Sequence, residues 1–521
     1  MATAAKMTSG IALEEQAADP AQTDDVVTSR MPGGEEQSDS ATESETANLA
    51  SACKPGWVCP VLLVVLTAAL YWPTIGFDFV NWDDPWYVIN NPLVQSWQPA
   101  NLVTMATRPA VKNYAPVTMF SYLLDHTFWG LDPGGFHFTN CLLHVVNAVL
   151  VYLLLFQLIG SRLVACAAAA MFAVHPVQVE SVAWISSRKG LLSGTFMLAS
   201  LIFWLREQRT PKSEGYGLLF FVLALLSKAN AVVLPAIVLT YDVLVRRQAA
   251  SVAFARQIVP GFFALLLLLV TMSAQTTEIG GVRDHLLFGK GHILAIDSLI
   301  VWKYIGMLIH PVNLCVLYDP PTSGIAGLVA VAIAGWITVA GLAIYCRKRW
   351  PLITFGISLF FLLLLPVLNL FPISTLMNDR YLYLPSIPLF ALAAAGVVKL
   401  CAWGRSTSRD LGLRRRGFRV VGANVRWGIA SVLLLAVVTN FSRQTCQQLP
   451  HWKHGMALWQ HTDKLAGQLA VVQIQLANTL HASGRDREAI ARLDAALENC
   501  NPDPLDRGRI LQKLADWQPS R

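Results

Sequence analysis

Long uncharged runs dominate the hydrophobic pattern of this chain. The first of them, from Trp57 to Phe77, contains no charged residue over 21 positions. About 20 apolar residues are enough for a helix to cross the hydrocarbon core of a bilayer. Further runs, several of them short, follow at 141–159, 163–179, 191–205, 216–227, 229–245, 258–273, 324–345, 351–371, 381–401 and 427–441. The pattern therefore predicts an all-α, polytopic membrane protein with about 11 transmembrane helices.

The distribution of Lys and Arg predicts which face of the membrane each loop occupies. With the N-terminus in the cytoplasm, the inner loops collect 17 basic residues and the outer loops nine, and the positive-inside rule favours that orientation. It requires 216–245 to be a hairpin that turns near Lys228, and 292–310 to be an outer-face helix instead of a span. The loops then placed outside, with the tail from Ser442, are 77–137, 175–190, 274–323 and 372–380.

Composition agrees with a membrane protein. Hydrophobic residues make up 54% of the chain and charged residues 14%, against about 25% charged in soluble domains, so we do not expect a soluble enzyme. Residues 1–53 carry a net charge of −8 and almost no large apolar side chains, which predicts a disordered cytoplasmic tail. The remainder, at +15, does not call for a nucleic-acid partner. The nine cysteines show no CxxC or CxxxC spacing and indicate neither a zinc site nor a disulfide framework.

The C-terminal segment has the pattern of a soluble helical repeat. Small and apolar positions within 471–503 recur at the spacing of a tetratricopeptide helix pair; an isolated amphipathic helix pair is the alternative. Fewer than two repeats do not form a stable solenoid alone, so we expect residues 452–516 to dock on the membrane domain, on a lipid surface or on a protein partner. The predicted domains are an acidic tail at 1–53, a membrane domain at 54–441 and a helical domain at 442–521.

Two adjacent carboxylates, Asp83 and Asp84, follow the first span closely. Such a pair can deprotonate an incoming hydroxyl or hold a divalent metal. Consecutive residues of an extended segment point to opposite sides, so we expect only one of them to face a given reacting atom. The alternative is an Asx-type turn before Pro85, in which an Asp caps the next helix.

A second cluster lies between two spans and contains His175, Glu180, Arg188 and Lys189. These groups suit an anionic headgroup, because a guanidinium can grip a phosphate through two hydrogen bonds. His175 and Glu180 can also relay a proton. The alternative is that Arg188 and Lys189 only anchor their helix at the membrane interface.

Further basic residues lie in the other outer segments. Asp379 and Arg380 precede the last but one span, where they either take part in binding or close a loop as an ion pair. Arg108 and Lys228 complete a set of basic groups that can converge on one phosphate.

Five segments occur together in the order seen in one family: WDD after the first span, HPVQVESVAWISSRKGLLSG, LLSKANAVVLP, HPVNLCVLYDP and MNDRYLYLPSI. From about residue 57 to the tail, the chain resembles the polytopic GT-C glycosyltransferases with tetratricopeptide tails. That group includes the transmembrane O-mannosyltransferases that act on cadherins, together with bacterial relatives.

The resemblance implies sugar transfer from a polyprenyl-phosphate donor, at the outer face, to a hydroxyl of a protein or glycan. It implies Asp83 as general base with Asp84 beside it, and it assigns the donor phosphate and sugar to His175, Glu180, Arg188, Lys189 and Arg380. The basic residue Arg108 of the first outer loop is expected to join them at the phosphate. We expect no cofactor, because a monophosphate leaving group needs less help from a metal than a diphosphate does, although Asp83 and Asp84 can hold a divalent metal. Where relatives read Arg-Lys-Asp, this chain has Gly190 in the third position.

Two other functions remain open. Gly190 and the short repeat array fit a catalytically inactive membrane scaffold that recruits partners through its tail. A transporter of lipid-linked sugars fits the number of spans, but the sequence shows no inverted repeat.

The first span is expected to be an uncleaved signal anchor. Because the tail and the chain are short, we expect a bacterial inner membrane, with the endoplasmic reticulum as the alternative.

Overall fold

The computed structural model describes residues 56–109, 113–278, 288–370, 375–403, 416–500 and 502–517. Contacts divide the chain into Met1–Lys54 and Pro55–Arg521, and the tail predicted at 1–53 lies outside the described residues.

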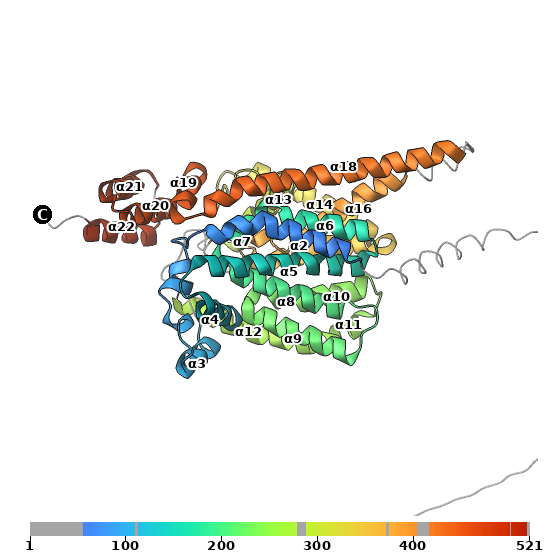
Figure 1. Cartoon of the computed structure of the whole chain (residues 1–521), viewed down its shortest axis with the longest axis horizontal. Helices are drawn as coiled ribbons and strands as arrows, with labels where there is room; N and C mark the ends of the chain where they lie inside the picture. Colours follow the sequence, from blue (N-terminus) through green and yellow to red (C-terminus); the bar gives the residue numbers. More distant parts are fainter. Residues whose placement is uncertain are drawn as a thin grey trace, which may run out of the picture. The chain divides into compact units, whose positions relative to one another are not determined.

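The described residues form helices, and they contain no sheet (Figure 1). The helices are α2 (Val58–Tyr71), α3 (Pro99–Thr107), α4 (Pro116–Trp129), α5 (Pro133–Ile159), α6 (Arg162–Val174), α7 (Val179–Ala183), α8 (Arg188–Trp204), α9 (Pro211–Ser227), α10 (Leu234–Leu244), α11 (Ala250–Arg256), α12 (Ile258–Glu278), α13 (Lys290–Ile309), α14 (Ala326–Arg349), α15 (Pro351–Leu364), α16 (Ser386–Trp403), α18 (Arg416–Gln448), α19 (Gly455–Ala466), α20 (Ala470–Ala482), α21 (Asp486–Asn499) and α22 (Pro504–Trp517). Short helical segments used below are η1 (Trp72–Gly76), η2 (Pro85–Ile89), η4 (Pro176–Gln178), η6 (Ala229–Val233), η9 (Asp379–Leu382) and η10 (Leu449–Trp452).

Helix α5 is the centre of the bundle and packs against α2, α6 and α8. The apolar runs predicted from sequence become these helices, because in lipid every backbone polar group must be paired within its own segment. The next layer is the tightly packed pair α8 and α9. Their close approach requires glycine at position 217, since a Cβ there would lie 2.4 Å from the Trp204 indole. As predicted, α9 ends directly before Lys228.

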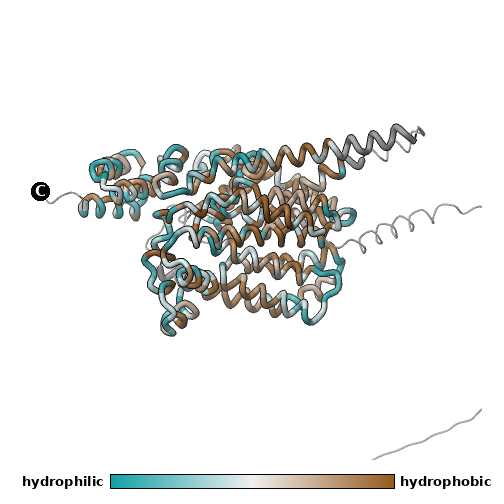
Figure 2. Tube along the Cα trace, in the orientation of Figure 1, coloured by the Kyte–Doolittle hydropathy of each residue, from teal (hydrophilic) through white to brown (hydrophobic). Residues whose placement is uncertain are grey.

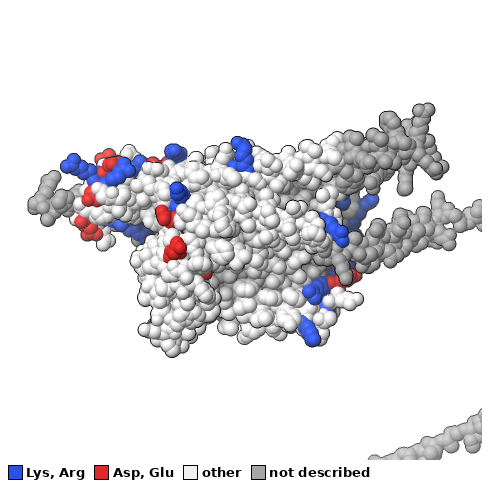
Figure 3. Space-filling model, viewed as in Figure 1, with Lys and Arg blue, Asp and Glu red and all other residues white. Residues whose placement is uncertain are grey.

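Length and composition identify a multi-pass membrane protein. Among the described residues, four helices are long and apolar enough to cross a bilayer, or up to six if each bent pair is one span; three further apolar helices are shorter. Figure 2 shows the hydrophobic middle of the bundle, and Figure 3 shows most charged side chains near its two ends. The expected number of about 11 spans stays a prediction.

Helix α13 differs from its sequence interpretation. It covers the run 292–310, which the charge pattern assigns to the outer face, yet it meets the length and composition of a span. Two of its charged residues, Asp297 and Lys303, have partners inside the protein. Asp297 accepts a 2.7 Å hydrogen bond from Asn369, and the Lys303 ammonium lies 5.0 Å from the Tyr318 ring centre. Internal pairing lowers the cost of charge in an apolar helix, so charge alone does not exclude it as a span.

Three loops predicted to share the cytoplasmic side meet at one end of the bundle, which we call the basic end. Arg247 donates a 3.0 Å hydrogen bond to the Lys348 carbonyl, and Arg246 donates to the carbonyl of Arg206. Helix α8 runs from this end to the opposite one, where Arg188 begins it. That opposite end, where the segments before η2, α7, the start of α8 and η9 meet, is called the site end.

The C-terminal helices dock on the membrane body, the first of the three expected possibilities. Helices α19 to α22 pack in sequence, so that α19 and α22 flank the helix pair formed by α20 and α21. Their identity as a tetratricopeptide repeat stays a prediction. Thr445 at the end of α18 donates a 2.7 Å hydrogen bond to the Val174 carbonyl, and His461 lies 2.8 Å from the Leu314 carbonyl.

Candidate functional site

The site end brings together charged residues that are far apart in the sequence. Glu180 from α7 lies against Arg380 from η9, and its carboxylate also interacts with Lys228, which caps α9. Lys228 in turn interacts electrostatically with Lys189 of α8 and with Arg380. The carboxylate of Asp83 interacts with both Lys189 and Arg380. Four of the eight site residues predicted from sequence are therefore neighbours, with Lys228 as a fifth member of the cluster.

Glu180 holds Arg380 in two ways. Its Oε2 accepts a 2.8 Å hydrogen bond from the Arg380 backbone amide, and its Oε1 pairs with the guanidinium. The guanidinium lies 5.1 Å from the centre of the buried Trp184 ring. A cation beside an aromatic face is attracted by the negative charge of that face. Arg380 therefore keeps a fixed direction while its side chain remains 15% exposed.

Two of the three cations, Lys228 and Arg380, line a small cavity. Gly190, Lys228, Asn230, Arg380 and Tyr383 line it, together with apolar neighbours, and it offers about 20 Å³ to the centre of a water molecule. Burial, then the positive charges of Lys189 and Arg380, lower the pKa of Lys228 to about 7, against the effect of Glu180. Such a desolvated group of like charges attracts an anion.

Lys189 is oriented by the loop that follows the first apolar helix. Its ammonium donates a 3.2 Å hydrogen bond to the buried Tyr87 hydroxyl and lies 4.7 Å from that ring's centre. Tyr87 follows the two carboxylates by a few residues, in η2. The first loop therefore supplies both the carboxylate of Asp83 and a support for Lys189.

Asp83 and Asp84 point to different environments, as expected for consecutive residues. Asp84 is buried; its Oδ1 accepts from the Ser186 amide at 3.0 Å and the Ser186 hydroxyl at 2.5 Å, and its Oδ2 from the Val80 amide at 2.9 Å. Burial raises the pKa of Asp84 to about 6, and these hydrogen bonds act in the opposite direction. Asp84 does not cap η2 through its side chain. The Asp83 carboxylate is partly exposed and receives no hydrogen bond from the residues that the structure describes.

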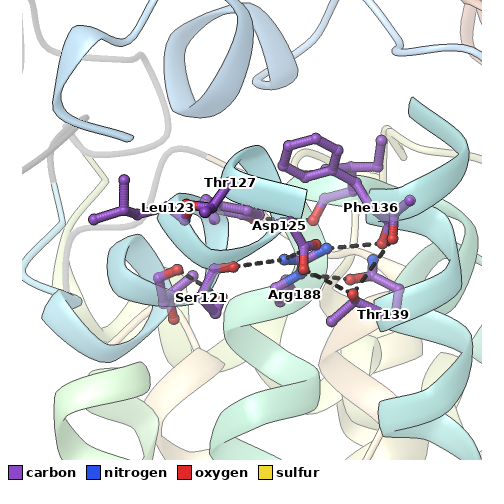
Figure 4. A network of polar contacts seen from close by, with 12 residues as sticks. Ser121, Leu123, Asp125, Thr127, Phe136, Thr139 and Arg188 are labelled. Carbon is purple, nitrogen blue, oxygen red and sulfur yellow. Dashed lines mark hydrogen bonds and ion pairs between the residues drawn. The ribbon is translucent and has the colours of Figure 1, made fainter. Parts of the chain in front are cut away.

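Arg188 lies in a separate buried network of polar contacts (Figure 4). It forms a 2.5 Å ion pair with Asp125 and donates hydrogen bonds to the Asn140 side chain at 2.8 Å and the Phe136 carbonyl at 2.7 Å. Each of its three nitrogens has a protein partner, and the side chain is fully buried. These contacts give Arg188 a structural role and lend no support to the phosphate contact expected from sequence.

His175 and Arg108 also lie apart from the cluster. The Nδ1 of His175 accepts from the Val177 amide at 3.2 Å and so caps η4, while its Nε2 lies 3.2 Å from the Leu308 carbonyl. Both ring nitrogens are thus engaged, and no hydrogen bond joins His175 to Glu180 among the described residues. Arg108 is exposed at the C-cap of α3. The structure therefore does not bring these two residues to the cations.

Several residues of the site end were missed by sequence reasoning. Tyr87 accepts a hydrogen bond from Lys189, and Ser186 donates one to Asp84. Asp125 forms an ion pair with Arg188. Asp379, which was already named from the sequence, accepts a hydrogen bond from Tyr318, and burial followed by the nearby Glu180 raises its pKa well above the usual range. The sequence signal for such residues is a polar side chain within an otherwise apolar segment. The residue that pairs with that side chain can be identified only from the three-dimensional structure.

Sequence comparison confirms the resemblance inferred from the motifs. The chain is 24% identical over 463 residues to "Protein O-mannosyl-transferase F38B6.6" of Caenorhabditis elegans, covering 82% of this chain and 61% of that protein. It is 24% identical over 521 residues to "Protein O-mannosyl-transferase TMTC1" of Homo sapiens, covering 84% of this chain and 54% of that protein. The Drosophila melanogaster protein of that name is 32% identical over 31% of this chain and 19% of its own length. No family model matches.

Two solved structures are similar in their chain trace. The Archaeoglobus fulgidus oligosaccharyltransferase tethered with an acceptor peptide has a TM-score of 0.44 at 13% identity, covering 77% of this chain and 55% of its own. ArnT from Cupriavidus metallidurans, bound to undecaprenyl phosphate, has a TM-score of 0.39 at 16% identity, covering 80% of this chain and 81% of its own. The reported sequence relatives are animal proteins, so they do not support the expected bacterial inner membrane.

Proposed function

We propose that this chain is a glycosyltransferase that moves mannose or another hexose from a polyprenyl-phosphate donor to a hydroxyl of a protein or glycan at the extracytoplasmic face. One observation carries the proposal. Asp83, a carboxylate without a hydrogen bond from the described residues, interacts electrostatically with Lys189 and Arg380 at the end of a membrane bundle. The names of the sequence relatives agree with mannose as the sugar and protein as the acceptor.

The proposed chemistry needs one base and one positive site. Asp83 removes the proton of the acceptor hydroxyl, whose oxygen forms a bond to C1 of the sugar while the bond from C1 to the phosphate oxygen breaks. Lys189, Lys228 and Arg380 stabilise the negative charge that develops on the departing lipid phosphate. Asp84 and Arg188 position the loops and do not touch the substrate. This assignment keeps Asp83, Lys189 and Arg380 in the roles expected from sequence.

We propose that no metal takes part. Asp84 has both carboxylate oxygens occupied by protein donors, so only Asp83 would be free to bind one. Three cations already supply the positive charge that a metal would bring to the phosphate. Transfer is therefore expected to continue in EDTA; complete loss that manganese or magnesium restores would make Asp83 a metal ligand instead.

The decisive experiment is sugar transfer in proteoliposomes with short-chain polyprenyl-phosphate sugars, using hydrolysis of the donor as an acceptor-free readout. Asp83→Asn is expected to lower the rate at least about 100-fold, the usual contribution of a general base. Asp494→Asn, an exposed carboxylate in α21, is the matched control. If Asp83→Asn retains full activity, the proposed base is wrong. Activity absent from the wild type with every donor, together with a strong effect of deleting 452–521, would favour the scaffold.

The orientation of the chain in the membrane can be tested with introduced glycosylation sites. Charge placement favours the site end outside the cytoplasm, and the animal relatives make the endoplasmic reticulum the better of the two expected membranes. Glycosylation acceptor sites introduced near Asn101 and near Gln208 would report the two ends separately. Modification at the first position alone would support this orientation, and modification at the second would reverse it.

A further inference from the structure

The C-terminal helices hold the loop that carries Asp83. Asn81 donates a 2.8 Å hydrogen bond to the Thr479 hydroxyl in α20 and accepts a 2.9 Å bond from the Trp459 indole in α19. Lys453 lies in the short connection between η10 and α19, and its carbonyl accepts a 2.9 Å hydrogen bond from the Asp78 amide. The contact is intimate, because a Cβ at Gly455 would lie 2.2 Å from the Asn81 side-chain oxygen.

Asp83 is thereby fixed from both sides. On one side, Trp82 packs edge-on against the fully buried Trp459, with ring centres 5.2 Å apart. On the other side, Asp84 is bound to Ser186 of the second outer segment. The single residue between these two anchors is the proposed base. Its position therefore depends on the C-terminal helices as much as on the membrane helices.

A second contact supports the cationic side of the site. Trp452 in η10 stacks on Trp184 with ring centres 6.0 Å apart, and both indoles are buried. Trp184 is in turn the ring beside the Arg380 guanidinium. The C-terminal segment thus lies behind both Asp83 and Arg380, through two separate tryptophan pairs.

We propose that η10, α19 and α20 are positioning elements of the active site: Asn81 and Trp459 set the place of the base, and Trp452 sets that of Arg380. This inference rests on the proposed glycosyl transfer. It assigns the C-terminal helices a part in turnover, in addition to any recruitment of partners. The two pairs act on different steps, since Asp83 acts on the acceptor proton and Arg380 on the donor phosphate.

The test changes residues of the C-terminal helices that contact the loop carrying Asp83. Gly455→Ala displaces Asn81 without changing any residue of the site, and Trp459→Phe removes the indole donor and reduces the ring surface packed against Trp82. Both are expected to lower kcat of donor hydrolysis, by up to about 100-fold for a displacement near 1 Å, with KM for the donor nearly unchanged. Trp452→Leu is expected to raise KM instead. Gly508→Ala, where an added Cβ meets nothing within 4 Å, is the control.

The outcomes separate the two proposals. If Gly455→Ala and Trp459→Phe are folded and keep wild-type kcat while Asp83→Asn is inactive, the positioning role is overturned and the glycosyltransferase remains. If Asp83→Asn keeps full activity, the proposed role of Asp83 as the base is wrong, and the positioning role that rests on it is wrong as well. Folding is checked by monodisperse elution in detergent, and a fall in folded protein without a change in kcat per folded molecule would also contradict the inference.

Discussion

Glu180 binds Arg380 through the backbone amide and the guanidinium at once, and its own side chain is buried. Removing one partner of a buried ion pair leaves an uncompensated charge, at a cost of about 3–5 kcal/mol. Glu180→Ala is therefore expected to lower the unfolding temperature in detergent and to weaken donor binding, because Arg380 loses its fixed direction. Glu180→Gln, which keeps an acceptor for the amide, should lose less. Equal stability of Glu180→Ala and the wild type would show that the pair contributes little.

Lys228 predicts a pH limit on donor binding. Its pKa of about 7 means that the ammonium is present below pH 7 and is lost as the pH rises through that value. Binding of a short-chain polyprenyl phosphate should therefore weaken between about pH 6 and pH 8, on top of the phosphate's own titration. Lys228→Arg should remove this loss, since a guanidinium stays charged. If the arginine variant shows the same pH dependence as the wild type, another group titrates.

Gly190 is the departure from the family pattern, and its position gives it a physical meaning. A Cβ at this residue would lie 3.9 Å from the Lys228 ammonium. Gly190→Asp should therefore place a carboxylate beside Lys228, raise its pKa and compete with an anionic ligand. We expect donor binding about tenfold weaker than for Gly190→Asn, which has the same size without the charge. Tighter binding by the Asp variant would instead mean that the family carboxylate helps the site.

The sequence predicted the helical membrane body and the break at Lys228, and it named Asp83, Lys189 and Arg380, which the structure brings together, because apolar run length and charge in loops are local signals. It did not separate Arg188 from its neighbour Lys189. Consecutive residues at the start of a helix diverge by about 100° around its axis, so one enters the buried network and the other reaches Tyr87. The docking of the tail on Asn81 depends on pairing across almost 400 residues, which no local pattern encodes.

The Arg188 network gives a prediction that distinguishes structure from binding. Asp125→Asn breaks a buried pair and is expected to destabilise the protein by about 3–5 kcal/mol. The fraction that remains folded should bind a polyprenyl phosphate with an affinity within about threefold of the wild type, because the nitrogens of Arg188 are all bound by protein groups. Thermal unfolding and lipid binding, measured on the same preparation, check both parts. A large loss of affinity at normal stability would return Arg188 to the phosphate site.

A stacked histidine pair predicts that acid loosens the docked tail. The His451 and His461 rings are parallel with centres 3.6 Å apart, beside Lys464. Burial, followed by His461 and Lys464, lowers the pKa of His451 to about 4 from 6.5. The folded state therefore favours the neutral ring: docking is fully stable above about pH 6.5, and this stability is lost as the pH falls towards 4.

Hydrogen exchange across 449–466 between pH 7.5 and 4.5 should show faster exchange in acid. His451→Gln should flatten that dependence, whereas His481→Gln, in α20 outside the pair, should not. If the tail positions Asp83, turnover should fall in the same window and recover in the His451 variant; exchange independent of pH would exclude the pair as the cause.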